Sequence, residues 1–243
     1  MGSRTPQRVR PSSWLDFWNG AQHLYVNDRH REVHFRDTSA RILALATDPG
    51  AHVLDYGPGE ATYADRIAAA VGRLTLCEAA DQTRRELAAR FAGNPKVDVV
   101  QPAALAELAD SSVDLMVVNS VVQYLRRSEL DQLLVLARRL LTTDGRLVIG
   151  DVIPRRASVI SEVAAILRLA VRERFLVAAL ASLVVTAFSP YSRIRAQLGL
   201  SRYDEAEMVA LLDAAGFAAV RQPFNLSHNP ARLTFVAAPH DRK

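Results

Sequence analysis

Two glycines and two carboxylates occur where a nucleotide-like ligand could bind. The run Asp55-Tyr56-Gly57-Pro58-Gly59 follows a short apolar segment and precedes a segment of helical composition. Glycines in such a turn let the backbone approach a ligand at the N-terminus of a helix. Glu78 ends the next apolar segment, about 20 residues further on, where an acidic side chain can accept hydrogen bonds from both hydroxyls of a ribose. This spacing predicts a site for a ligand that contains a nucleoside.

The charge of Asp55 restricts which ligand of this kind fits. A carboxylate inside the turn repels a pyrophosphate, but it attracts a ligand that carries an ammonium and a sulfonium group. The turn therefore favours S-adenosylmethionine over a nicotinamide dinucleotide. A Rossmann-like domain that binds another nucleotide, or none, is the alternative.

Three further side chains could act on a nucleophile held beside this ligand. Tyr124 and Asp151 lie at the ends of later apolar segments, and His228 lies in a short loop near the C-terminus. An imidazole of ordinary pKa is suited to removing a proton near neutral pH. Each residue has a structural alternative, because Asp151 can cap a turn, Tyr124 can pack under a helix and His228 can be a solvated loop residue.

An N-terminal run contains three histidines, His23, His30 and His34. Histidines at such spacings can bind a metal ion, yet no cysteine or carboxylate spacing completes a recognisable site. We therefore expect no bound metal.

The elements that must position these residues alternate along the chain. Apolar segments at 52–54, 73–80, 96–101, 113–120 and 145–153 are separated by segments of helical character. This alternation predicts a parallel sheet wrapped by helices on both faces. Two more strands, joined by a short loop, close the chain as a hairpin, so the last strand is antiparallel. The expected fold is α/β, a Rossmann-like, doubly wound and mostly parallel seven-stranded sheet with an antiparallel terminal hairpin and a helical cap.

Length and composition agree with one principal domain. The chain has 243 residues, of which 49% are apolar and 23% charged, which excludes collagen-like, coiled-coil and wholly disordered proteins. Cys77 is the only cysteine, so no intramolecular disulfide can form, and we expect a cytoplasmic protein. We expect an N-terminal tail and helical lid over residues 1–40, and a ligand-binding domain over 41–243 with a helical insertion at 155–200.

The insertion is both apolar and basic. Between Arg155 and Arg202 there are eight arginines and two acidic residues, while residues 175–188 carry no charge. A run of this length is too short to span a bilayer. The insertion is therefore either a cap packed on the domain or a second subunit, or a surface that receives an amphiphilic or anionic substrate or docks peripherally on a membrane. The total net charge of +4 is too small to indicate nucleic-acid binding.

Several motifs occur in an order that resembles the class I S-adenosylmethionine-dependent methyltransferases. They are VLDYGPGEATYA, LTLCEAA, VDLMVVNSVVQYL and LLTTDGRLVIGDVIP. The resemblance implies that the cofactor is held by Asp55, Gly57, Pro58, Gly59, Glu78, Ala79, Ala103, Ala104, Asn119 and Tyr25. In that assignment Glu78 holds the ribose, Asn119 meets the amino-acid end, and Tyr25 belongs with Trp18 to a lid.

The sequence departs from the family pattern at two places. Ala61 stands where a third glycine is common, and no Asp follows the third strand to contact adenine, which leaves that contact to the backbone around Ala103 and Ala104. No Asp/Asn-Pro-Pro-Tyr motif follows the fourth strand, which argues against methylation of nucleic-acid bases. We expect a methyltransferase for oxygen or carbon atoms of a small, apolar or amphiphilic molecule, with His228, Asp151 and Tyr124 as catalytic residues; a non-catalytic, cofactor-binding partner protein is the alternative.

Overall fold

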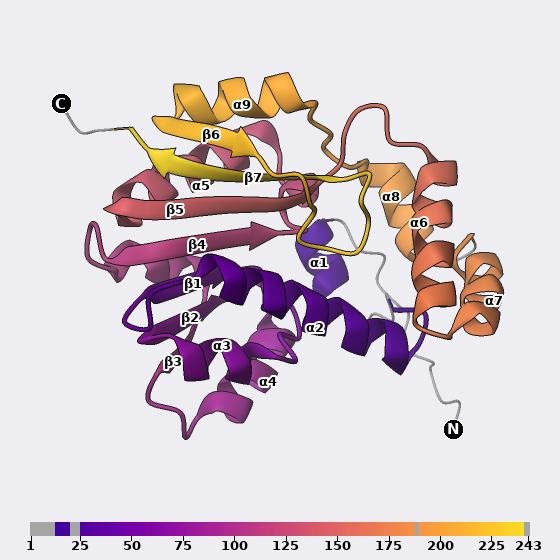
Figure 1. The fold of residues 1–243 in the computed structure, drawn as a ribbon, viewed down its shortest axis with the longest axis horizontal. Coiled ribbons are helices and arrows are strands. Elements are labelled where there is room, and N and C mark those ends of the chain that lie inside the picture. Colours follow the sequence, from indigo (N-terminus) through magenta and orange to yellow (C-terminus); the bar gives the residue numbers. More distant parts are fainter. Residues whose placement is uncertain (1–12, 20–24, 188–189, 241–243) are drawn as a thin grey trace, which may run out of the picture.

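Seven strands form one sheet in the computed structural model, which describes residues 13–19, 25–187 and 190–240 (Figure 1). The strands are β1 (His52–Tyr56), β2 (Arg73–Cys77), β3 (Val97–Val100), β4 (Val113–Asn119), β5 (Leu141–Val152), β6 (Phe217–Arg221) and β7 (Leu233–Pro239). Their order across the sheet is β3-β2-β1-β4-β5-β7-β6. β1 to β5 pair in parallel, while β7 is antiparallel to both β5 and β6. The predicted Rossmann-like sheet with an antiparallel terminal hairpin is confirmed.

Helices cover both faces of this sheet. They are α1 (Trp14–Trp18), α2 (Asp28–Leu45), α3 (Ala64–Ala70), α4 (Asp81–Phe91), α5 (Arg127–Leu140), α6 (Val159–Arg172), α7 (Leu176–Ala187), α8 (Pro190–Leu198) and α9 (Glu205–Ala214), with short 3₁₀ turns η1 (Pro102–Glu107) and η2 (Val122–Tyr124). α2 runs without interruption through residue 40, so the expected boundary between a lid and the main domain falls inside one helix. Within the described ranges, no helix has the length and apolar character needed to cross a membrane.

The strand residues alternate between two apolar layers because successive side chains of a strand point to opposite faces. In β4, Met116 and Val118 pack in the layer that contains α5 and α9, whereas Leu115 and Val117 pack with α2, α3 and α4. The central strands are thus buried on both faces, which fixes their register and the edge at which they end.

The insertion after β5 folds as the expected helical cap of α6, α7 and α8. A separate apolar cluster joins Val33 of α2 to Leu169 of α6 and to Phe175, which precedes α7. The cap therefore packs on α2, beyond the ends of the strands (Figure 1).

Candidate active site

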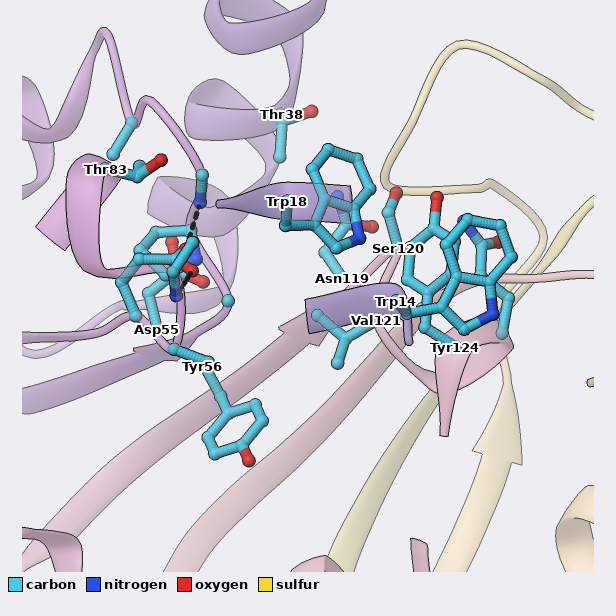
Figure 2. A pocket seen from close by; sticks show the side chains of 18 of the residues that line it. Trp14, Trp18, Thr38, Asp55, Tyr56, Thr83, Asn119, Ser120, Val121 and Tyr124 are labelled. Carbon is cyan, nitrogen blue, oxygen red and sulfur yellow. Dashed lines mark hydrogen bonds between the residues drawn. The ribbon is translucent and has the colours of Figure 1, made fainter. Parts of the chain in front are cut away.

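A cavity of about 1950 Å³ opens where β1, β2 and β4 end, beside α1 (Figure 2). Its walls come from these strand ends, from α1 and α2, and from Ala178 and Ala181 of the cap. Pockets for one drug-sized ligand enclose about 300–1,000 Å³. This cavity therefore has room for a nucleoside cofactor and a second small molecule.

The glycine turn lies at the floor of the cavity and needs glycine for two different reasons. Gly57 has a φ of +74°, and a Cβ built on it would lie 2.5 Å from Cγ2 of Val121. Gly59 has a φ of +58°, but a Cβ there would meet no atom within 4 Å. Gly57 is thus constrained by conformation and space, and Gly59 by conformation alone.

Ala61 also adopts the left-handed conformation, with a φ of +42°. Alanine in place of the third glycine of the family pattern therefore strains the backbone here, because a Cβ disfavours this region.

Asp55 and Glu78 bring two carboxylates into the same cavity. The carboxylate of Glu78 accepts hydrogen bonds from the backbone N–H groups of Gly59 at 3.1 Å and Ala80 at 2.8 Å. Burial, and to a lesser extent the negative charge of Glu78, raise the pKa of Asp55 to about 7. Burial also raises the pKa of Glu78, against the lowering effect of its backbone hydrogen bonds. A ligand with positive charges, such as the predicted S-adenosylmethionine, fits this pair of carboxylates.

Of the other residues predicted to hold the cofactor, some line the cavity and some do not. Pro58, Ala79 and Asn119 line the cavity, whereas Ala103 and Ala104 do not; their neighbour Pro102 does. The side-chain amide of Asn119 donates to Ser227 Oγ at 3.4 Å, and its buried Oδ1 has no hydrogen-bond partner in the described part of the chain.

Aromatic side chains of the N-terminal segment cover the cavity. The rings of Trp14 and Trp18 lie 4.6 and 5.4 Å from the ring of Tyr124 (Figure 2). Tyr25 lines the cavity too, and burial raises the pKa of its hydroxyl. Tyr124 therefore lines the cavity but is packed between aromatic rings.

Asp151 is held in a network at the end of β5. Its carboxylate accepts hydrogen bonds from Ser120 at 2.8 Å, Asn225 at 2.8 Å and Arg232 at 2.6 Å. Burial favours a higher pKa for Asp151, but the charge of Arg232 and these hydrogen bonds together hold it below its ordinary value. Asp151 is not among the cavity-lining residues, so it is better placed to orient its neighbours than to take a proton from a substrate.

Two of the three N-terminal histidines cluster with His228, and His23 lies outside the described residues. The ring of His228 lies 5.3 Å from that of His30 and 6.4 Å from that of His34. Of these three, His34 alone lines the cavity. Burial, and to a lesser extent the neighbouring His228, lower the pKa of His34 to about 4. The described residues hold no group of three or more histidine, cysteine or acidic side chains arranged to bind a metal.

His34 is the functional candidate that the sequence did not single out for proton transfer. A signal was present, because the spacing of four residues puts His30 and His34 on one face of a helix. What the sequence could not give is the loop of His228 packed behind that face.

Comparisons with known proteins agree with the geometry. Residues 54–149 match the family model described as a methyltransferase domain. A search of curated proteins found no significant match to this sequence.

Solved structures share the fold at low sequence identity. The pyocyanin biosynthetic protein PhzM matches with a TM-score of 0.55 and 19% identity over 86% of this chain, which spans 55% of PhzM. The 1,6-didemethyltoxoflavin-N1-methyltransferase of Burkholderia thailandensis was solved with bound 1,6-didemethyltoxoflavin and S-adenosylhomocysteine. It matches with a TM-score of 0.54 and 20% identity, over 85% of this chain and 78% of that one. Magnesium protoporphyrin IX methyltransferase from Synechocystis PCC 6803 was solved with bound S-adenosylmethionine. It matches with a TM-score of 0.56 and 16% identity, over 93% of this chain and 89% of that one.

The matched residues run from Leu54 in β1 to Ile149 in β5, and they include Asp55, Glu78 and Asn119 but not Asp151. Residues 54–149 therefore match a methyltransferase domain, and the chain shares the fold of methyltransferases solved with S-adenosylmethionine or S-adenosylhomocysteine.

Proposed function

We propose that this enzyme transfers a methyl group to an oxygen or carbon atom of a small, largely apolar molecule. The observation that carries the proposal is one cavity that extends from the carboxylates of Asp55 and Glu78 to an apolar wall of aromatic residues and cap alanines. Two of the structures with the same fold are a 1,6-didemethyltoxoflavin-N1-methyltransferase and a magnesium protoporphyrin IX methyltransferase. These names agree with a small-molecule acceptor in the cavity.

The residues at the strand ends would hold the cofactor. Asp55 offers a negative charge to the ammonium and sulfonium groups, and Asn119 lies at the amino-acid end. Glu78 accepts two backbone hydrogen bonds, but a carboxylate has about four acceptor sites, so it can also accept from ribose hydroxyls. The sulfonium supplies an activated methyl group, and the protein mainly aligns and desolvates the reacting partners.

His34 is our candidate for the group that accepts a proton from the nucleophile. It faces the cavity, its imidazole is neutral at physiological pH because its pKa is low, and that ring makes no hydrogen bond to any described residue. His228 lies behind it, and the ionised Asp151 acts electrostatically on both histidines. In this arrangement His228 and Asp151 are positioning residues, and Tyr124 orients the acceptor.

Two measurements test the proposal in sequence. Isothermal titration with S-adenosylmethionine and S-adenosylhomocysteine should show binding to the wild type and a large loss for Asp55→Ala. Incubation of a cell extract with methyl-labelled cofactor should then label a product of low molecular weight. Cofactor binding without any label transfer would instead favour the non-catalytic partner protein, and label found only in protein or nucleic acid would contradict a small-molecule acceptor.

A further inference from the structure

The outer face of the cap carries large apolar side chains that lie in the open. Val171 at the end of α6 is 62% exposed and Val177 of α7 is 83% exposed, and Leu176 and Leu180 are also exposed. α6 and α7 lie at the edge of the molecule, beyond the strand ends (Figure 1). These four residues, with Arg168 and Arg174, are called the cap patch below.

The cap patch is one continuous surface. Val171, Arg174, Leu176 and Val177 line a single shallow groove of about 700 Å³. Leu180 follows Leu176 by one helical turn, so the two share a face of α7. Arg168 precedes Val171 by three residues and therefore lies next to it on α6. Apolar and basic side chains thus alternate over one surface.

The positive charge of the cap patch is left for an external partner. Within the described residues, Arg168 and Arg174 have no acidic partner, although other cap arginines do. The paired ones are Arg155 with Glu207, Arg172 with Asp37 and Glu173, and Arg195 with Glu162. Arg156 of the insertion and Arg202 just after it also have no acidic partner among the described residues, and Arg202 donates to the carbonyl of Ala157 instead. Arg168 and Arg174 are the unpaired arginines that lie beside the exposed apolar residues.

The cap patch also adjoins the active site. Ala178 and Ala181 line the outer groove and the deep cavity alike, so α7 separates the two with small side chains. An apolar molecule at the cap patch is therefore one helix away from the cavity.

We propose that the cap patch docks on the surface of an anionic lipid bilayer, from which the enzyme takes its acceptor. Exposed valine and leucine enter the boundary between headgroups and acyl chains, and arginines beside them are attracted to anionic headgroups. The claim that the bilayer supplies the acceptor rests on the function proposed above. Docking itself is measured without cofactor, so its failure is distinguishable from failure of methyl transfer.

Arg174 offers a variant that separates charge from folding. Its φ is +62°, and it occupies the turn after α6 in which Phe175 N–H donates to the carbonyl of Ala170 at 2.8 Å. Helix ends of this kind favour glycine. Arg174→Gly should therefore raise the thermal midpoint while it weakens bilayer binding by about fivefold.

The experiment is co-sedimentation of the full chain with vesicles of equal parts phosphatidylcholine and phosphatidylserine. We expect binding that falls with added salt and is weaker on phosphatidylcholine alone. Val177→Asp combined with Leu180→Asp should weaken binding at least about tenfold, because both side chains leave the apolar boundary. Val135→Asp is the matched control, since Val135 is 69% exposed but lies on α5, and it should bind like the wild type.

Three results would overturn the proposal. One is wild-type protein that stays in the supernatant. Another is a Val177→Asp/Leu180→Asp variant that binds vesicles as well as the wild type. The third is light scattering that shows a dimer which the paired Asp variant converts to a monomer, without vesicle binding; the cap patch would then be a contact between two copies of the chain.

Discussion

Arg232 ties the end of the sheet to the cap. Its Nη1 lies 2.6 Å from Asp151 Oδ2 of β5, and its Nη2 lies 3.0 Å from Glu162 Oε1 of α6. The side chains of Arg232 and Asp151 are both largely buried, with 16% and 7% of their surface exposed.

Removing Arg232 should destabilise the protein strongly. Arg232→Met leaves the carboxylate of Asp151 buried beside no compensating charge, which costs about 3–5 kcal/mol of unfolding free energy. Adding Asp151→Asn should recover much of this loss, because the uncompensated charge disappears. Urea unfolding of the two variants measures both effects, and equal instability of the single and double variants would contradict a charge-based role.

Cofactor affinity should depend on pH through Asp55. Because the pKa of Asp55 is about 7 without a bound cation, its carboxylate must lose a proton before it can attract the sulfonium. The dissociation constant for S-adenosylmethionine should therefore rise by about tenfold for each pH unit below 7, and be flat above it.

Asp55→Asn is the control for that pH dependence. It should bind the cofactor about 10- to 100-fold more weakly above pH 7, and its affinity should not vary with pH in this range. Titration calorimetry at a series of pH values checks both. A wild type whose affinity is constant from pH 5.5 to 8 would show that Asp55 does not titrate on binding.

The two glycines of the turn should respond differently to alanine. Gly57→Ala combines a left-handed backbone with a clash against Val121, and should cost about 2–4 kcal/mol of stability. Gly59→Ala should cost about 1–2 kcal/mol of stability, because only its left-handed backbone is strained. Adding Val121→Ala should relieve Gly57→Ala and leave Gly59→Ala unchanged, as measured by chemical unfolding. Equal effects on both single variants would indicate that Val121 yields freely.

His34 and His228 can be separated by kinetics. His34→Gln should lower kcat by about 10²–10⁴ while leaving the affinity for S-adenosylmethionine nearly unchanged, because loss of a base affects the chemical step. His228→Gln should have a smaller effect, since His228 lies behind His34. His240→Gln, at an exposed histidine, should be fully active. The reverse order of effects would restore His228 as the base that the sequence first suggested.

The sequence by itself determined the sheet, the glycine turn and the nature of the cofactor site. These features depend on neighbours along the chain: strand alternation, a turn that needs glycine at Gly57, and the spacing between Asp55 and Glu78. Parallel strands then bring their ends to one edge without further information. The helical cap could likewise be foreseen from the composition of residues 155–200.

Only the tertiary structure decided which polar groups are free to act. The carboxylate of Asp151 accepts hydrogen bonds from Arg232, Asn225 and Ser120, and these contacts hold it in place beside the cavity. His34 is a candidate because the packing of α2 turns it into the cavity, while His30 and His228 stay outside the lining. Such contacts join residues far apart in the chain, and neither local pattern nor composition encodes them. They arise from the way helices and loops pack at the end of the sheet, which sets burial, charge pairing and access to the cavity.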